Sequence, residues 1–203
     1  MRTLSAIIAA LAACASQTVA AQTIGQKYDR TNVTVNQNSG LSTKCRPAIA
    51  RAVATWNGQS SPFTYSYSTT ATRSSLENGD DNNLTFDYTS DTTMGTALAQ
   101  TRYDNAISGN RYRDADIYIN ANRLFYTTSS GDNIGEYFCP SSAGQTTPSN
   151  RYDFETVVLH ELGHAFGLAH FSSTSCTLYA SLAPGQQKRV PCSTEVGVFN
   201  SIY

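Results

Sequence analysis

The amino-acid sequence predicts a single α+β domain, and two kinds of pattern lead to that fold class. Apolar and polar side chains alternate over Phe63–Tyr67, Leu84–Tyr88 and Ala115–Ile119, as they do in strands that bury one face. Between Pro47 and Asn57 the apolar residues recur instead at spacings of three and four, the period of an amphipathic helix. The chain has 203 residues, 40% of them hydrophobic, and is therefore long enough for one domain with a substantial core.

The first 21 residues are typical of an export signal, with a basic residue at position 2, an apolar run from Leu4 to Ala13 and small residues up to Ala21. Neither that run nor any later segment reaches the length that spans a bilayer. A second interpretation is a bacterial lipoprotein site, with Cys14 as the lipidated N-terminus. We favour cleavage near Ala21, which leaves residues 22–203 as a secreted domain.

Further elements follow in chain order. A strand is expected at Asn32–Asn36, where Val33 and Val35 share one face, and the helix at Pro47–Asn57 tolerates proline in its first turn. The acidic loop Glu77–Asn83 raises the alternative of a calcium site, but it lacks the spacing of an EF-hand, so we favour a solvated turn. The polar stretch Asp132–Asn150 is expected to be a loop.

After that loop, Asp153 is expected to cap a helix that contains the most informative stretch of the chain. Its eleven residues, HELGHAFGLAH, run from His160 to His170 and include all three histidines of the sequence. Histidines four apart project from the same face of a helix, so His160 and His164 lie side by side. Gly167 can adopt positive φ at no steric cost, end the helix and let the chain bring back the third histidine.

Three neutral imidazoles suit zinc, which in catalytic sites takes three protein ligands and a water. Zinc lowers the pKa of that water, but a base must still accept the proton. Glu161 follows the first expected ligand and occupies the general-base position of HExxH metalloproteases. The alternative, a core helix with hydrogen-bonded histidines, is disfavoured because all three histidines of the chain fall at ligand positions.

The longer pattern HExxHxxGxxH resembles the signature of the metzincin clan of zinc proteases, and the chain is most similar to the matrixin catalytic domain. The resemblance implies a metzincin zincin-like fold with a twisted, mostly parallel five-stranded sheet and an active-site helix. It also implies an upper part, residues 22–167, and a small C-terminal subdomain, residues 168–203. The latter would carry a C-terminal helix at Ser193–Tyr203.

Three positions differ from the usual matrixin pattern. Leu178 stands at the methionine position of the turn beneath the metal, an exchange that roughly conserves volume and usually costs less than about 1.5 kcal/mol. Phe171 follows the third ligand, where a serine is usual. Gln100 stands where many matrixins have a histidine that holds a structural zinc, so the resemblance implies one catalytic zinc ion.

The resemblance also assigns substrate contacts. Gly95–Tyr103 resembles the edge strand over which matrixins lay an extended peptide, and Leu98 and Ala99 match its backbone-pairing positions. Tyr179 and Ala180, which follow the turn at Leu178, are expected to contact the substrate as well.

Four cysteines remain beyond the export signal: Cys45, Cys139, Cys176 and Cys192. An even number in an exported chain suggests two disulfides, with three connectivities, and buried free thiols are the alternative. In the matrixin resemblance, Cys176 and Cys192 flank both the turn at Leu178 and the wall of the specificity pocket. We therefore expect these two to pair and leave Cys45 to pair with Cys139.

The expected function is that of an exported, monomeric zinc endopeptidase that acts on peptide or protein substrates. The alternative is a non-catalytic zinc-binding or adhesive module that retains the fold. Glu161 argues against this alternative, because a purely structural metal site does not need that carboxylate. A formal net charge of −1 argues against a nucleic-acid partner, which usually calls for a basic surface.

Overall fold

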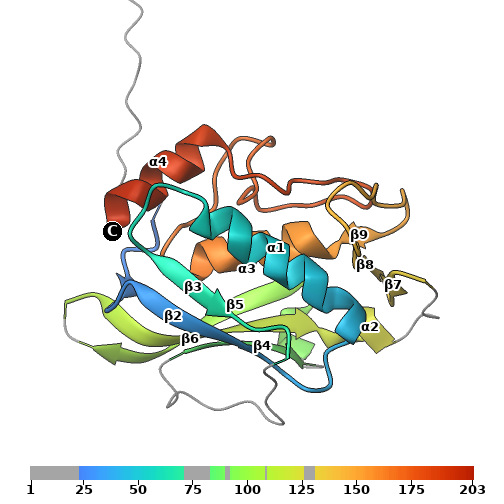
Figure 1. Cartoon of the computed structure of the whole chain (residues 1–203), viewed down its shortest axis with the longest axis horizontal. Helices are drawn as coiled ribbons and strands as arrows, with labels where there is room; N and C mark the ends of the chain where they lie inside the picture. The colour runs from blue at the N-terminus through green and yellow to red at the C-terminus, as the bar shows by residue number, and fades with distance from the viewer. Residues whose placement is uncertain (1–22, 71–82, 90–91, 108, 126–130) are drawn as a thin grey trace, which may run out of the picture.

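The computed structural model describes residues 23–70, 83–89, 92–107, 109–125 and 131–203. Within them a twisted sheet carries two long helices on one face, and a third helix lies near the C-terminus (Figure 1). The expected export signal, residues 1–21, and residues 77–82 of the acidic loop lie outside the described part of the chain. Over that part, no helix is long and apolar enough to cross a membrane.

The main sheet has six strands rather than the expected five: β1 (Lys27–Tyr28), β2 (Asn32–Gln37), β3 (Thr64–Tyr67), β4 (Leu84–Thr89), β5 (Ala99–Ile107) and β6 (Arg111–Asn120). The additional strand, β1, pairs with β6 through two residues only, too few for a periodic pattern in the sequence. All pairings are parallel except that of β5, which runs antiparallel to β6.

Strand β5 is the edge that matters for the site, because within the described residues it pairs with β6 alone. It begins at Ala99, four residues later than the expected edge strand, since a 3-10 turn, η3 (Thr92–Met94), and Gly95 with a φ of 52° precede it. Leu98 lies just before the strand. Its carbonyl oxygen accepts hydrogen bonds from the Asn120 backbone N–H at 3.0 Å and the Tyr137 hydroxyl at 2.6 Å.

The helices begin and end close to where the sequence places them: α1 (Arg46–Asn57), α3 (Phe154–Ala165) and α4 (Ser193–Ile202). A 3-10 turn, η2 (Thr43–Cys45), precedes α1, and a short helix, α2 (Ala121–Phe125), follows β6. The predicted cap of α3 is confirmed, because the Asp153 carboxylate accepts a hydrogen bond from the backbone N–H of Thr156 at 3.0 Å.

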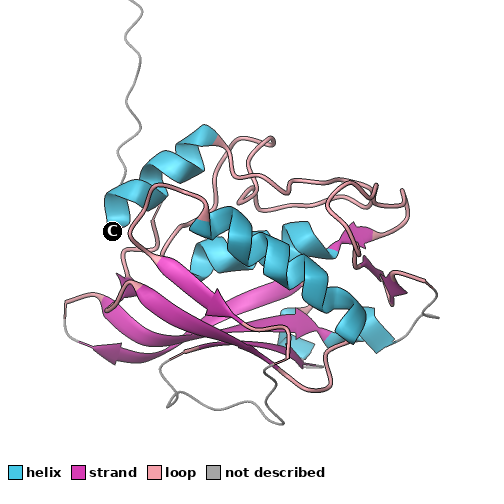
Figure 2. Ribbon diagram, viewed as in Figure 1, coloured by secondary structure: helices cyan, strands magenta, loops and turns pink. Residues whose placement is uncertain are grey.

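The stretch Asp132–Asn150 is mostly loop, but it contains two short strands, β7 (Asn133–Ile134) and β8 (Tyr137–Phe138). They form a second, small sheet with β9 (Tyr152–Asp153), which directly precedes α3. Between α3 and α4, by contrast, residues 166–192 form neither helix nor extended strand (Figure 2). This connecting segment therefore has no regular pattern of backbone hydrogen bonds.

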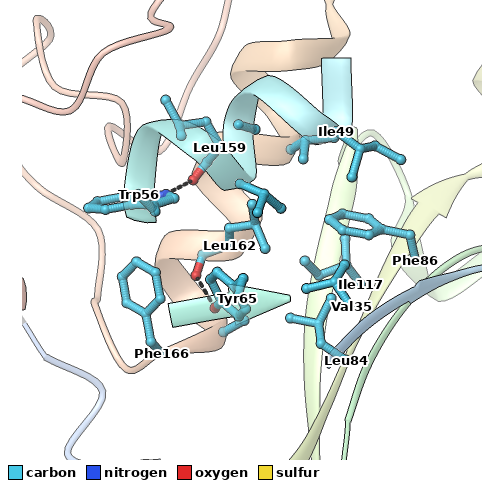
Figure 3. Close-up of a cluster of buried hydrophobic side chains, with 14 of the residues drawn as sticks. Val35, Ile49, Trp56, Tyr65, Leu84, Phe86, Ile117, Leu159, Leu162 and Phe166 are labelled. Atoms are coloured by element: carbon cyan, nitrogen blue, oxygen red, sulfur yellow. Dashed lines mark hydrogen bonds between the residues drawn. The ribbon is translucent and has the colours of Figure 1, made fainter. Parts of the chain in front are cut away.

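The core lies between the sheet and the helices (Figure 3). From the sheet, apolar side chains at alternate positions point toward α1 and α3; from the helices, one apolar face points back. The buried residues that Figure 3 labels are Val35, Ile49, Trp56, Tyr65, Leu84, Phe86, Ile117, Leu159, Leu162 and Phe166. This packing confirms the predicted α+β class.

Helix α3 is buried to its end, so the carbonyl oxygens of its last turns need donors other than water. Aromatic side chains supply them from four other elements and the C-terminal residue. The pairs are Trp56 Nε1 to Leu159 O (2.9 Å), Tyr65 hydroxyl to Leu162 O (3.1 Å), Tyr103 hydroxyl to His164 O (2.9 Å), Tyr112 hydroxyl to Ala165 O, and Tyr203 hydroxyl to Phe166 O (3.0 Å).

Two disulfides join the chain in the expected pairing, Cys45 with Cys139 and Cys176 with Cys192. The first links the start of α1 to the segment that leads into α3. The second closes the segment that runs below the end of α3.

Two neighbouring tyrosines allow a matched test of the donors to α3. Tyr28 and Tyr112 are both fully buried, with ring centroids 4.6 Å apart, but among the described residues the Tyr28 hydroxyl has no hydrogen-bond partner. We expect Tyr112→Phe to lower the free energy of unfolding by about 1 to 3 kcal/mol, because it leaves the Ala165 carbonyl unsatisfied. Tyr28→Phe should leave it unchanged or raise it.

The measurement is equilibrium unfolding in urea with the disulfides intact. If Tyr112→Phe and Tyr28→Phe lower the free energy of unfolding equally, the hydrogen bond from the Tyr112 hydroxyl to α3 does not account for the loss.

Candidate metal centre

The structure brings the three histidines of the sequence together. His160 and His164 project from one face of α3, and His170 returns to them after the helix ends. The ring centroids lie 4.6 Å apart for His160 and His164, 5.2 Å for His160 and His170, and 4.7 Å for His164 and His170. One nitrogen of each ring lies within 4.8 Å of the others, so a single metal ion can contact all three.

Two features of the structure require glycine at position 167, where the chain turns back toward the helical histidines. Its φ is 110°, a conformation that residues with a Cβ rarely adopt. A Cβ at this position would also lie 2.4 Å from the carbonyl oxygen of Gln26, because the chain leading into β1 passes close by. The sequence indicated the positive φ, but not the close approach of a segment 141 positions away.

Backbone carbonyls orient the two helical imidazoles. The Nδ1 atom of His160 lies 2.9 Å from Thr177 O, and that of His164 lies 2.8 Å from Leu168 O. A carbonyl oxygen only accepts hydrogen bonds, so each Nδ1 carries a proton, and in the neutral ring Nε2 keeps a free lone pair. Those two Nε2 atoms face each other at 3.0 Å.

Two lone pairs at that separation repel, whereas a cation shared between them would attract both. The donor set therefore fits a metal ion. Three neutral imidazoles that leave a further coordination position open are the ligand set of catalytic zinc sites.

The electrostatic surroundings favour the neutral rings that metal binding requires. Burial, and next the proximity of His164, lowers the pKa of His160 to about 3. Burial, followed by His164, also lowers the pKa of His170. Both imidazoles are therefore unprotonated at neutral pH.

Glu161 places a buried carboxylate beside the three histidines. The hydroxyl of Thr101, on β5, lies 2.7 Å from Glu161 Oε2 and 3.1 Å from its backbone carbonyl oxygen. Burial raises the pKa of Glu161, while His164 and the hydrogen bonds of Thr101 oppose that rise. A carboxyl group in such a setting can accept and return a proton. Nothing in the sequence around Thr101 indicated this contact.

Leu178 packs against α3 at Gly163, between the two helical histidines. It is fully buried, and a Cβ at Gly163 on α3 would lie only 2.9 Å from its side-chain methyl carbons. Leucine therefore fills the position that the sequence analysis compared with a methionine, and the glycine of the HELGH stretch gives it room. The backbone N–H of Phe171 donates to Leu178 O at 2.9 Å, which closes the turn.

A buried carboxylate on α4 holds this turn. Glu195 accepts hydrogen bonds from the backbone N–H groups of Thr177 at 3.2 Å, Cys192 at 2.6 Å and Leu178. Burial raises the pKa of Glu195, and these donors counteract the rise. Glu195 was not among the residues predicted from the sequence. The available signal was a glutamate at the third position of the C-terminal helix, where it completes a capping box.

The histidines and Glu161 line a cleft of about 520 Å³. Strand β5 and the residues before it form one side, and α3 with the segment after His170 forms the rest. All four residues that the resemblance assigned to substrate contact line this cleft: Leu98, Ala99, Tyr179 and Ala180. So does Lys188, which the sequence analysis did not single out.

Comparison with known protein families agrees with this geometry. The model of the family described as Matrixin matches residues 26–199. A search of curated proteins finds no match. The matched region includes the three histidines, Glu161 and both disulfides.

We expect the purified protein to hold one zinc ion per chain, measurable by elemental analysis after gel filtration. His164→Ala should lose it, because two imidazoles remain where zinc sites use at least three protein ligands. Glu161→Gln should keep it, which makes that variant the matched control. Zinc should also raise the melting temperature of the wild type and not of His164→Ala, because a ligand of the native state stabilises that state. Stoichiometric zinc in His164→Ala would contradict the assigned site.

Proposed function

The chain belongs to the matrixin family of zinc-dependent metalloproteases, and from this premise we propose that it is an exported endopeptidase with Glu161 as its general base. The observation that carries the proposal is the buried carboxylate of Glu161 beside three converging imidazoles in an open cleft. A non-catalytic zinc module would not need that carboxylate.

His160, His164 and His170 would hold the zinc ion, and the carbonyls of Thr177 and Leu168 orient the first two rings. When bound, zinc supplies Lewis acidity that makes water more acidic and polarises the carbonyl of a peptide bond. The protein contributes two rings that are already oriented, so little ordering is left for the moment of binding.

Glu161 then moves the proton. Its carboxylate accepts a proton from the attacking water and returns it to the nitrogen of the leaving amine. Burial favours the protonated form of this carboxyl group once it has accepted the proton. The Thr101 hydroxyl, 2.7 Å from Oε2, fixes the direction in which the carboxylate points. Thr101 is thus a positioning residue for the base.

Substrate would lie along β5 as an added strand, since this strand is an edge of the sheet. Because the Leu98 carbonyl oxygen already accepts two hydrogen bonds within the protein, the peptide would pair with the Leu98 N–H and with the backbone of Ala99, the first residue of the strand. Tyr179 and Ala180 would contact the peptide from the opposite side of the cleft.

Export is part of the proposal. Residues 1–21 would act as the signal, with cleavage near Ala21 rather than lipidation at Cys14, and residues 22–203 would form the monomeric catalytic domain. Two disulfides support an oxidising compartment, because such bonds persist mainly in exported proteins.

The first test is Glu161→Gln, which keeps the shape of the side chain and removes its basicity. We expect peptide turnover to fall by about 10²- to 10⁴-fold while zinc content stays at the wild-type level. Turnover and metal content are measured on the same sample, against an unbiased peptide library. Undiminished turnover would exclude Glu161 as the base, and a zinc-loaded wild type that cleaves nothing would favour the non-catalytic module.

A second test addresses Thr101. We expect Thr101→Val to lower kcat by about tenfold with little change in KM, because one charge-assisted hydrogen bond to the base is lost. Thr101→Ser should restore most of the activity, since it keeps the hydroxyl. If the valine and serine variants behave alike, the hydroxyl does not position Glu161.

A further inference from the structure

Lys188 is a positive charge within the cleft. Apart from the histidines and Glu161, it is the sole ionisable acid or base lining the cleft among the residues that the structure describes, tyrosine phenols aside. It is half-buried and belongs to the segment without regular structure that precedes α4.

The backbone of Lys188 is fixed from two directions. Its N–H donates to Thr156 Oγ1 at 2.8 Å, one turn before His160 on α3. Its carbonyl oxygen accepts a hydrogen bond from Thr177 Oγ1 at 3.0 Å, and the carbonyl of Thr177 in turn orients the His160 ring. The lysine is therefore held at a defined distance from the metal centre.

The next residue reinforces this placement. Arg189 contacts the buried Asp153 carboxylate through two nitrogens, Nη2 to Oδ1 at 2.6 Å and Nε to Oδ2 at 2.9 Å. Asp153 is also the cap of α3. The segment that carries Lys188 is thus tied to the helix that carries His160 and His164.

Within the described part of the chain, the ammonium group of Lys188 has no anionic partner. It lies over the Tyr179 ring, 4.8 Å from the centroid, and reaches the carbonyl oxygen of Ser181 only at 3.5 Å. Among the described residues, no carboxylate forms an ion pair with it. Burial lowers its pKa, and the more distant Glu195 opposes this effect. A partly desolvated cation beside an aromatic ring and a carbonyl group is well placed to gain from an incoming carboxylate.

We propose that Lys188 selects substrates with an acidic side chain next to the scissile bond. The inference rests on the proposed endopeptidase function and gives that function a substrate class. Tyr179, Ser181 and Lys188 form one wall of the cleft, and Thr156 and Val157 of α3 line it as well, close to His160. A glutamate entering there meets the ammonium group, whereas a lysine is repelled.

The experiment uses zinc-loaded full-length mature protein and peptides of one common sequence. Each peptide carries Glu, Gln, Lys or Leu immediately before or immediately after the scissile bond. All are amidated and extend at least three residues past that bond, so that no terminal carboxylate competes with the side chain. The variants are Lys188→Met, Lys188→Arg and Lys188→Glu, with zinc content measured for each.

For the wild type we expect glutamate to exceed glutamine in kcat/KM by about tenfold at one of the two positions, the effect of one half-exposed charge-assisted contact. Added salt should reduce this ratio. Lys188→Met should bring it to about one, Lys188→Arg should preserve it, and Lys188→Glu should make the lysine peptide the better substrate. A general loss of structure would not reverse the preference, so the reversal identifies charge recognition.

The outcomes separate the two proposals. Cleavage with no preference for glutamate over glutamine, or with a preference unchanged in Lys188→Met and Lys188→Glu, would overturn the role of Lys188 and leave the endopeptidase intact. A zinc-loaded wild type that cleaves neither these peptides nor the unbiased library would overturn the proposed function and this inference with it.

Discussion

The constraint on which the rest of the structure depends is that helix α3 ends inside the protein. The last carbonyl oxygens of a helix have no partners within it, and in the interior water cannot serve them. Hydroxyls of Tyr65, Tyr103 and Tyr112, from strands β3, β5 and β6, take that place. Because each donor comes from a different strand, the hydrogen bonds fix how α3 sits on the sheet, and with it the direction of His160 and His164.

The lower part of the molecule meets the same requirement differently. Residues 166–192 form no helix or extended strand, so isolated backbone hydrogen bonds and side chains satisfy their backbone groups. The Glu195 carboxylate accepts hydrogen bonds from three backbone N–H groups around the turn at Leu178. The carbonyl of Thr177 accepts a hydrogen bond from the His160 ring, and its hydroxyl donates to the Lys188 carbonyl. An irregular segment can thus form an ordered wall of a cleft, provided that buried charges hold it. The Cys176–Cys192 disulfide adds a covalent tie to the same region.

The features that the sequence predicted depend on residues close together in the chain, and the features that it did not predict depend on residues far apart. The alternation of 63–67 or the spacing of His160 and His164 reflects local geometry, which the sequence records directly. The cap at Asp153 and the return at Gly167 also depend on near neighbours. The contact of Thr101 with Glu161 joins residues 60 positions apart, and nothing local marks it.

Other features escaped the sequence because they are short or depend on tertiary contact. Strand β1 has two residues, and the chain that leads into it passes beside Gly167, 141 positions away from Gln26. Lys188 sits in a polar stretch whose composition is that of any surface loop, and only its attachment to Thr156 and Thr177 places it in the cleft. The sequence revealed that Leu178 replaces the usual methionine of the turn. It did not reveal that the Leu178 side chain packs closely against Gly163.

The way Lys188 is attached has a consequence for how this molecule could diversify. Its hydrogen bonds to Thr156 and Thr177 run through the main chain, and the neighbouring arginine carries the buried ion pair. The lysine side chain itself adds only its contact with the Tyr179 ring and a long hydrogen bond to the Ser181 carbonyl. A substitution at this one position would therefore change the charge of the cleft at little cost to stability, whereas a substitution of the arginine beside it would leave the buried Asp153 carboxylate without its ion pair.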